Sequence, residues 1–318
     1  MARQLDVDVL VPTWRRPSDL RRLLVALGTQ THLPKNVFVT VREDDASTWD
    51  ELERSSNLWS HLHLVAVSVP PGPLTKAMSI GLSRTRGNYV ALTDDDSEPS
   101  PIWIQQLLGY FANPEIGGVG GRDDQAHEPG EVFGEREVGC INLLGRLTAN
   151  HHLGAGPARE VDVLKGVNCC FRGDLLREIG FDFRLRGKSN VSHWEMSLCF
   201  AMRRRGWKLV YDPSIRITHH VAPREDGDVN ARGDFEAESY LDSVHNETLA
   251  TLEFLPTSQR FVYRIWSSLI GTRASPGILQ FFRLSLQHGN WKLQLSRFLT
   301  ARRGRRQGLK TFRASGES

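Results

Sequence analysis

The 318-residue sequence has no long hydrophobic run. No apolar stretch approaches the roughly 20 residues that a membrane-spanning helix requires, so we expect no transmembrane segment. The first six residues lead directly into an apolar strand, so we also expect no secretory signal peptide. With 40% hydrophobic and 24% charged residues, the composition is ordinary for a globular protein. The chain can bury a sizeable core, as one large domain or as one domain with an appendage.

Cysteine is scarce, and the four cysteines form no recognisable site. They are Cys140, Cys169, Cys170 and Cys199. None has the spacing of zinc ligands, and the adjacent pair is a poor candidate for a disulfide. We therefore expect reduced thiols in a cytoplasmic protein.

Acidic residues are missing from one long stretch. Between Phe254 and Gly316 there is no Asp or Glu but there are twelve Lys or Arg, which leaves 28 basic against 37 acidic residues elsewhere. Aromatic and aliphatic residues alternate with these cations, which indicates basic amphipathic helices, broken near Ser275-Pro276-Gly277. Such helices lie on anionic membrane surfaces, although solvated cations on helices that cap the rest of the protein are an alternative. No nucleic-acid motif accompanies the basic region, so we expect no nucleic-acid partner.

The first part of the chain alternates between strand-like and helix-like patterns. Strand-like apolar runs occur at residues 7–11, 36–41, 64–69 and 88–93, and helical spacing at residues 17–27, 49–59, 74–84 and 102–111. This alternation predicts an α/β fold with a mixed, mainly parallel sheet flanked by helices.

The pattern loosens after Gly117. We expect strand and loop over residues 117–129, a short helix over 174–179, a strong helix over 194–205, a strand over 207–211 and a mobile charged loop over 222–238. The expected organisation is an α/β domain over residues 1–222, a charged loop and linker helix over 223–253, and a basic helical region over 254–318. His61, His63, His151 and His152 have no acids or cysteines at ligand spacing, so we interpret them as surface or loop residues.

The most informative polar cluster is Asp94-Asp95-Asp96, directly after the fourth strand-like run. Open α/β sheets bind ligands at the carboxyl ends of their strands. Three adjacent carboxylates repel one another, so the cluster is costly unless a cation neutralises it. Oxygen ligands suit Mg²⁺ or Mn²⁺, commonly together with substrate phosphates. The sequence therefore predicts a metal site here, with a solvated acidic turn as the alternative.

The order of motifs resembles the nucleotide-sugar-dependent glycosyltransferases of the GT-A fold, and most closely the inverting family 2. The matching segments are residues 9–13, 30–31, 44–47, 87–96, 166–172, 179–182, 194–195, 206–207, 211–213 and 219–220. Each segment alone is weak evidence, but all of them occur in order, over roughly residues 7–222. The resemblance implies a donor half at about residues 1–115 and an acceptor half at about 116–222.

The resemblance also implies which residues hold the donor. Pro12, Thr13 and Arg15 would lie in the loop that meets the base, and Asp45 would accept a base N–H of the kind uracil offers. A turn or helix-cap role is the alternative for Asp45. Lys76 would supply a cation for the diphosphate, with Arg84 or Arg86 as alternatives and a solvated surface position as the default for each.

Further donor and metal residues follow from the same resemblance. Asp94 and Asp95 would face the ribose or donor sugar, and Asp96 would hold Mn²⁺ or Mg²⁺ against the diphosphate. A histidine at this point would ligate the metal or contact the diphosphate, with a purely structural pair as the alternative. Adjacent His219 and His220 point opposite ways in an extended strand, so at most one would face the site, and we favour His219 as the metal ligand. The remaining pair, Gly166 and Asn168, would form a wall of the donor–acceptor cleft, with a simple strand-end turn as the alternative.

The catalytic base implied by the resemblance is Glu195. Inverting transfer needs a carboxylate that deprotonates the acceptor hydroxyl. The family places an acid pair at this point, and here the first acid is replaced by Trp194. An acid in the first turn of a helix could also serve as a partner of the helix dipole. A second departure is Met78-Ser79, where the family often has Arg-Asn.

These observations predict a hexosyltransferase-type enzyme that moves a sugar from a UDP-sugar to a glycan or lipid-linked acceptor in cell-surface polysaccharide synthesis. A sugar nucleotidyltransferase is less consistent with the sequence, because the loop at residues 12–17 lacks the glycines of a phosphate loop. A non-catalytic protein that binds nucleotide sugars remains an alternative, because Trp194 and Met78-Ser79 depart from the family pattern. The expected location is the cytoplasm, peripheral to the inner face of the plasma membrane.

Overall fold

The computed structural model describes residues 5–126, 137–220 and 235–316. The chain divides into two compact units. The first unit comprises residues 1–140, 148–181 and 201–223, and the second comprises residues 141–147, 182–200 and 224–318. All four cysteines are free, as the sequence predicts. No helix in the described segments combines the length and the hydropathy needed to cross a bilayer.

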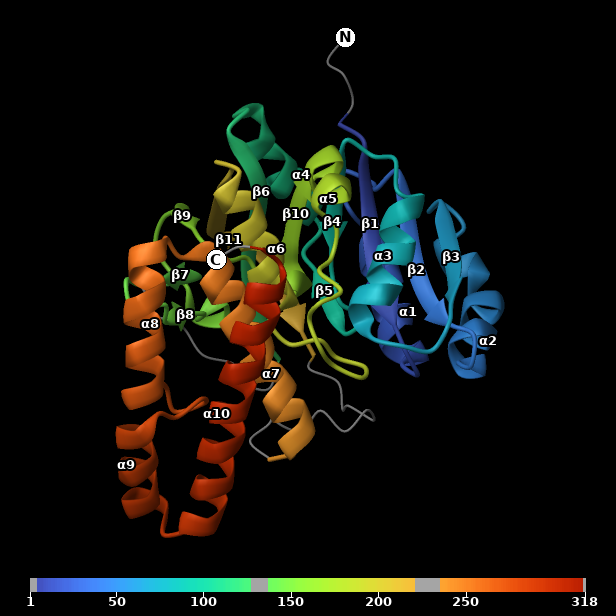
Figure 1. Cartoon of the computed structure of the whole chain (residues 1–318). Helices are drawn as coiled ribbons and strands as arrows, with labels where there is room; N and C mark the ends of the chain where they lie inside the picture. Colours follow the sequence, from blue (N-terminus) through green and yellow to red (C-terminus); the bar gives the residue numbers. More distant parts are fainter. Residues whose placement is uncertain (1–4, 127–136, 221–234, 317–318) are drawn as a thin grey trace. The chain divides into compact units, whose positions relative to one another are not determined.

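A nine-stranded sheet organises the first unit (Figure 1). Its strands are β1 (Val7–Thr13), β2 (Asn36–Arg42), β3 (Leu64–Val69), β4 (Tyr89–Leu92), β5 (Ser97–Pro99), β6 (Ile116–Gln125), β9 (Arg159–Val161), β10 (Cys169–Arg172) and β11 (Lys208–His219). They follow the order β3-β2-β1-β4-β10-β6-β11-β5, with β9 paired to β11. The four strands from β3 to β4 are parallel, and β10 runs antiparallel between β4 and β6. The predicted mixed α/β fold is therefore confirmed.

Helices cover both faces of the parallel half of the sheet. Side chains alternate along β1, so Val7, Val9 and Val11 join one core with the leucines of α1 (Pro17–Gly28) and with α4 (Trp103–Gly109). Leu10 points to the opposite face, where α3 (Leu74–Arg84) approaches closely: a Cβ added to Gly81 would lie 2.4 Å from Leu10. Burial on both faces is what a parallel sheet requires.

Some element boundaries differ from the sequence prediction. The helix expected over 49–59 begins earlier, as α2 (Ala46–Arg54), because Asp45 caps its first turn, and a 3-10 helix (Ser56–Trp59) follows it. The helix expected over 102–111 ends at Gly109 and continues as a 3-10 turn (Tyr110–Ala112). The strand expected over 207–211 extends to His219, with a register shift between Asp212 and Arg216.

The remaining elements of the described chain are short or helical. They are α5 (Gly173–Ile179), α6 (Trp194–Arg204), α7 (Ala237–Phe254), α8 (Thr257–Leu269), α9 (Ile278–His288), α10 (Trp291–Ala314), the strand pair β7 (Cys140–Ile141) and β8 (Leu147–Thr148), and 3-10 helices at His151–Leu153 and Gly166–Asn168. The loop predicted over 222–238 lies mostly outside the described residues, and its described end is the capped start of α7, where the Glu236 carboxylate accepts from the next turn.

In the second unit, α7 and α10 pack through small residues. A Cβ added to Gly304 would lie 2.9 Å from the carbonyl oxygen of Leu241, and one added to Gly308 would lie 2.7 Å from that of His245. Ala301, one turn before Gly304, is fully buried. The close approach of these two helices therefore depends on the absence of larger side chains along one face of α10.

Candidate active site

The three consecutive aspartates follow β4, which lies between β1 and β10 in the middle of the sheet. Thr93 fixes the start of their loop, because its hydroxyl donates to the carbonyl of Val167 at 2.8 Å and bonds to the Ser97 hydroxyl at 2.6 Å. Asp95 and Asp96 are only 3% and 4% exposed. Two of the three carboxylates are therefore buried and Asp94 is half-buried, which differs from a solvated turn.

A group suited to metal binding forms within the first unit. Asp94, Asp96 and His219 each offer one ligand atom, and these atoms lie within 4.8 Å of one another. His219 is the last residue of β11, and its Nε2 lies 3.2 Å from Oδ1 of Asp96. Two carboxylates and an imidazole are a donor set that Mn²⁺ accepts, with room for phosphate oxygens. The residues present thus fit the divalent ion that the sequence predicts.

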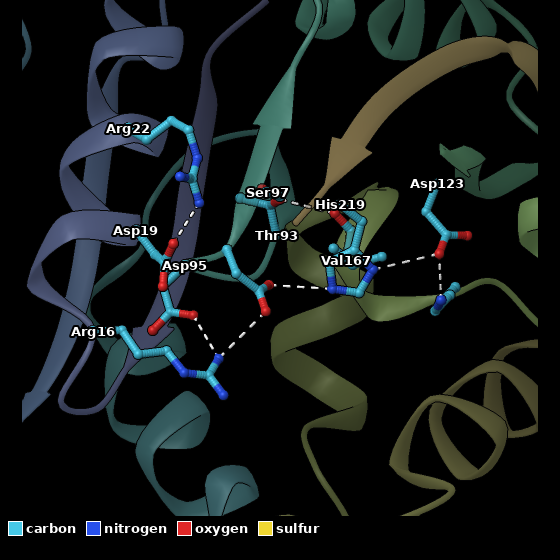
Figure 2. Close-up of polar contacts among 11 residues, drawn as sticks. Arg16, Asp19, Arg22, Thr93, Asp95, Ser97, Asp123, Val167 and His219 are labelled. Atoms are coloured by element: carbon cyan, nitrogen blue, oxygen red, sulfur yellow. Dashed lines mark hydrogen bonds and ion pairs between the residues drawn. The ribbon is translucent and has the colours of Figure 1, made fainter. Parts of the chain in front are cut away.

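The other side of the His219 ring faces Asp123 on β6, as Figure 2 shows. Nδ1 of His219 lies 3.6 Å from Oδ2 of Asp123, and Lys165 bonds the same carboxylate oxygen. Burial alone would lower the pKa of His219, but its contacts with Asp123 and Asp96 outweigh burial and raise that pKa to about 9. Although burial favours the neutral acid, His219 and Lys165 lower the pKa of Asp123 to about 2.

The first strand contributes a second set of contacts to the acidic loop. The Thr13 hydroxyl donates to Oδ2 of Asp95 at 2.8 Å. The Arg16 guanidinium lies 3.0 Å from Oδ1 of Asp95 (Figure 2) and 3.5 Å from Oδ2 of Asp96. Burial raises the pKa of Asp95 to about 7 against the opposing effect of Arg16. Asp95 therefore ties the loop after β4 to the loop after β1, while Asp94 and Asp96 face His219.

The two adjacent histidines point to different partners. His219 meets Asp96 and Asp123, whereas Nε2 of His220 lies 2.9 Å from Glu98. The backbone N–H of His220 donates to the carbonyl of Asp96 at 2.9 Å. The extended backbone thus directs one histidine to the acidic cluster and the other away from it.

Asp45 acts as a helix cap in the structure. Its carboxylate accepts from the backbone and hydroxyl of Thr48, from the hydroxyl of Ser47 and from the backbone N–H of Arg15. These four donors lower the pKa of Asp45, although burial acts in the opposite direction. Arg15, whose φ of 55° is in the left-handed region, is held in the loop after β1 by this contact. The base-binding role of Asp45 stays a prediction, while its cap role is observed.

Asn168 and Gly166 are buried in the sheet. The Asn168 amide donates to the carbonyls of Arg122 and Ile215 and accepts from the indole of Trp103. With the side chain fully buried, these bonds tie β6, β11 and α4 together. These contacts are structural, and the part of Gly166 and Asn168 in a cleft wall stays a prediction.

The other residues that the sequence singles out lie in or beside β1, α3 and α6. Pro12 is partly buried in β1, and Lys76 is exposed in the first turn of α3. Arg86 donates to the carbonyls of Ser83 and Thr85 at the end of α3, which is a structural contact. Glu195 lies in the first turn of α6, in the segment assigned to the second unit, and its role as a base stays a prediction.

Sequence reasoning missed three residues that contact the predicted site. Arg16 bonds the acidic loop, and Asp123 and Lys165 form the support behind His219. Asp123 lies in the last part of β6, after its apolar residues. An acid after an apolar strand-like run is the same kind of signal that singles out Asp94. Arg16 stands in the loop after β1, where a cation next to the predicted base-binding residues could also have been weighed.

One histidine was misjudged from the sequence. His151 is only 5% exposed, its Nε2 donates to the carbonyl of Val163 at 2.9 Å, and its ring packs edge-on against Tyr211. Burial lowers the pKa of His151 to about 4. The residue belongs to the core of the first unit and not to its surface.

Two kinds of known sequence match the chain. The sequence model of a family described as Glycosyltransferase like family 2 matches residues 4–232. The pre-mycofactocin glycosyltransferase of Mycobacterium tuberculosis is 26% identical over 218 residues, which cover 67% of this chain and 42% of that protein. The glucosyl-dolichyl phosphate glucuronosyltransferase of Haloferax volcanii is 29% identical over 156 residues, which cover 45% and 48% of the two chains. The chain therefore matches less than half the length of these curated relatives.

Solved structures share the fold. TarS of S. aureus, in complex with UDP-GlcNAc, matches with a TM-score of 0.60 at 15% identity. The match covers 93% of this chain and 81% of the TarS chain. The mannosyltransferase PcManGT of Pyrobaculum calidifontis, in complex with GDP-Man and Mn²⁺, has a TM-score of 0.58 at 13% identity and covers 96% and 88%. These likenesses confirm the GT-A fold that the sequence predicts.

Proposed function

The chain belongs to the glycosyltransferase-like family 2, and from that premise we propose that it is a metal-dependent, inverting enzyme that transfers a sugar from a nucleoside-diphosphate sugar to an acceptor hydroxyl. The observation that supports metal dependence is the convergence of Asp94, Asp96 and His219 within 4.8 Å of one another. A divalent ion bound there would neutralise charge that develops on the leaving diphosphate. Mn²⁺ suits a set with an imidazole nitrogen better than Mg²⁺ does.

The protein's own residues have separable roles in this proposal. Asp94, Asp96 and His219 hold the ion. Asp95 and Thr13 connect the acidic loop to the loop after β1, where Pro12 and Arg15 would meet the base and Lys76 would offer a cation to the diphosphate. Asp45 supports this site by fixing the backbone of Arg15. Asn168 holds β6, β11 and α4 together, and Gly166 with Asn168 would form a wall of the donor–acceptor cleft.

Glu195 is the proposed base. Its carboxylate would take the proton of the acceptor hydroxyl while that oxygen bonds the anomeric carbon and the nucleoside diphosphate leaves from the opposite face. Because attack and departure occur on opposite faces, the configuration at the anomeric carbon inverts. A base of this kind contributes about 10²- to 10⁴-fold to the rate.

UDP is the favoured donor nucleotide, and the acceptor is a glycan or a lipid-linked sugar in cell-surface polysaccharide synthesis. One relative with 29% identity is named for action on a dolichyl phosphate, which is a lipid-linked substrate. TarS, which shares the fold, was solved with a UDP-sugar. Four free cysteines support a reducing, cytoplasmic location. The match covers less than half of each of these curated relatives, so their substrates are only a guide to those of this chain.

A nucleotide panel tests the donor site first. The melting temperature is measured with UDP, GDP, dTDP and CDP, each with Mn²⁺ or with EDTA, because a ligand that binds the native state stabilises it by mass action. We expect one nucleotide to raise the melting temperature only with Mn²⁺, and we expect Asp96→Ala to abolish that rise. If no nucleotide stabilises the protein with either addition, the donor-site assignment is wrong.

A second variant separates an enzyme from a non-catalytic binding protein. Glu195→Gln removes the base but no residue of the acidic cluster. A transferase loses turnover in this variant and keeps its metal-dependent nucleotide shift. Both proteins are then assayed with nucleotide sugars of the base that the panel identifies, in the presence of glycan and lipid-phosphate acceptors. If the wild type binds the nucleotide but consumes none of these donors, the non-catalytic alternative is favoured.

A further inference from the structure

The second unit carries an apolar stripe on α8 that the protein leaves uncovered. Phe261, Ile265 and Leu269 recur at a spacing of four residues, and they are 64%, 44% and 48% exposed. Residues four apart lie on one face of a helix, so the three side chains form a continuous row. Val262 lies beside this row and is 43% exposed. The buried residues of α8, Tyr263 and Ser267, occupy the other side of the helix.

The next helix repeats this arrangement. On α9, Ile278, Phe282 and Leu286 also recur at a spacing of four residues, with Leu279 beside them. Leu286 is 87% exposed, and Phe282 and Leu279 are 58% and 60% exposed. Leu284 is the buried residue of this helix. Both helices therefore bury a narrow seam and present a broad apolar face to solvent, which is unusual for large side chains at this density.

A hydrogen-bonded connection joins the two helices. Gly271 and Pro276 form an isolated β-bridge, and the N–H of Gly277 donates to the carbonyl of Ile270 at 2.8 Å. Gly271 has a φ of 70°, which favours glycine at this tight turn. Figure 1 shows α9 continuing beyond the end of α8, and we call the two apolar stripes, together with the ordered turn between them, the α8–α9 surface.

The charges around this surface have one sign. Arg264, Arg273 and Arg283 are exposed on or between the two helices, and Lys292 is exposed at the start of α10. No acid occurs anywhere between Phe254 and Gly316, although the second unit has acids elsewhere, such as Glu238. Arg264 precedes Ile265 and Arg283 follows Phe282, so cations border both apolar stripes. The surface is therefore complementary to a partner that is negatively charged and apolar.

An anionic lipid bilayer matches this description better than another copy of the chain does. Two copies that met through this surface would bring two groups of cations together without a single compensating acid from either segment. A bilayer offers acidic headgroups to the arginines and an acyl boundary to the phenylalanine and leucine side chains. Arginine can also extend its aliphatic stem along the apolar region while its charge stays at the headgroups.

We propose that the α8–α9 surface docks the protein on an anionic membrane, with Phe261, Phe282 and Leu286 entering the headgroup–acyl boundary. The inference does not depend on the transfer reaction. It concerns only residues of the second unit. It assigns a role to a basic region that contains neither the acidic cluster nor the proposed base.

Vesicle sedimentation tests the proposal on the full chain. Vesicles of phosphatidylcholine alone are compared with vesicles that contain 30 mol% phosphatidylglycerol (about a physiological fraction of anionic lipid). We expect binding to the anionic vesicles, binding to the neutral ones weaker by about tenfold or more, and loss of most binding when the salt rises from about 0.1 M to 1 M. The fluorescence of Trp291, which is 56% exposed, provides a second signal, because insertion nearby should shift the emission to shorter wavelength.

Two variants separate the apolar and the charged contributions. Phe261→Ser with Phe282→Ser and Leu286→Ser removes three exposed side chains, and we expect about a tenfold or greater loss of binding without a change in melting temperature. Its matched control replaces exposed apolar residues outside these helices, Leu143→Ser with Phe183→Ser, which are 73% and 67% exposed. Arg264→Glu with Arg283→Glu should lose binding to the anionic vesicles, while Arg54→Glu with Lys208→Glu, on the first unit, should not.

Each other outcome contradicts the proposal. Equal binding to neutral and anionic vesicles would show that charge plays no part. Equal losses in the stripe variant and in its control would show that the α8–α9 surface is not the contact. Absence of vesicle binding together with a concentration-dependent dimer that the stripe variant disrupts would show that the surface joins two copies of the chain. A variant that binds less but also melts earlier is replaced by single substitutions at Leu286, the most exposed of the three.

Discussion

The two units use charge in opposite ways. The first buries acids beneath or at the edge of its sheet: Asp8, Asp95, Asp96 and Asp123 are each at most 4% exposed, and each has specific partners. The second unit places most of its C-terminal cations in solvent, beside large apolar side chains that are also exposed. Buried charge is costly, and it is retained where fixed geometry serves a reaction. Exposed charge of one sign serves recognition of an extended partner.

The largest effect should separate the two units by their roles in the reaction. Glu195→Gln, in the second unit, should lower turnover by about 10³-fold because a general base contributes on that scale. Asp96→Ala, in the first unit, should lower turnover and also abolish the Mn²⁺-dependent nucleotide shift. Turnover is measured as release of the nucleoside diphosphate from the donor that the binding panel identifies.

The exposed acid Asp50, on α2, supplies the control for both variants. Asp50→Asn should change neither turnover nor the nucleotide shift. Wild-type turnover in Glu195→Gln would show that another residue is the base. A nucleotide-induced rise in melting temperature that persists in Asp96→Ala would show that Asp96 is not needed for metal-dependent donor binding.

The second effect is a pH dependence specific to the first unit. The pKa of His151 is lowered to about 4 in the folded protein, so below an unfolded pKa of about 6.5 only the unfolded chain takes up the proton. The stability that neutral His151 provides is complete above pH 6.5 and is lost as the pH falls toward 4. Between pH 7 and pH 5 we expect a loss of about 2 kcal/mol from this residue.

Urea unfolding of wild type and His151→Gln at both pH values measures this loss. The variant should show a smaller decrease between pH 7 and pH 5. His193 and His245, whose pKa values are also lowered by burial, lie in the second unit and are unchanged in the variant, so their contribution cancels. Identical pH dependences in the two proteins would show that His151 is not held neutral.

The third effect concerns the support behind His219. A carboxylate that contacts the second nitrogen of a ligating histidine orients the ring, and its loss commonly weakens metal binding by about 10- to 100-fold. Asp123→Asn should therefore weaken Mn²⁺ binding, measured by titration of free Mn²⁺ with electron paramagnetic resonance. Asp124→Asn is the neighbouring control, because Asp124 bonds Arg122 and Arg216 instead. Equal Mn²⁺ affinities in the two variants would show that Asp123 does not support metal binding through His219.

The smallest effect compares glycines of the two units. Gly308→Ala places a Cβ 2.7 Å from the carbonyl oxygen of His245, so we expect the second unit to lose about 1–2 kcal/mol despite the better helix propensity of alanine. Gly109→Ala, in α4 of the first unit, meets no atom within 4 Å and should gain up to about 1 kcal/mol. Calorimetry of the two variants checks the sign, and stabilisation by Gly308→Ala would show that α7 and α10 can separate without cost.

Much of the first unit followed from local pattern. The strands around β1 are apolar runs of the right length, and the leucines of α1 have helical spacing, so the fold and the position of Asp94–Asp96 at a strand end were predictable. The alternation of side chains along a strand predicts that only one of His219 and His220 faces the acidic cluster, and in the structure His219 does. These features are local, and a single sequence carries them.

The contacts between distant segments could not be predicted. Nothing in the sequence pairs Arg16 with Asp95 or Asp123 with His219, because these residues meet only when β1, β4, β6 and β11 come together in one sheet. The three hydrogen bonds that Asn168 makes to Trp103, Arg122 and Ile215 also join segments far apart in the sequence, so no local pattern predicts them. Burial also made His151 a core residue, although its neighbours in the sequence are polar.

The contact of Arg16 with Asp95 and Asp96 has a consequence for how the protein exists between turnovers. Arg16, Lys165 and His219 already supply positive charge to the buried acids, so the first unit does not need a divalent ion in order to fold. If the proposed metal dependence holds, a chelator should stop turnover and leave the protein folded and recoverable. In that state Arg16 would remain in contact with Asp95 and Asp96.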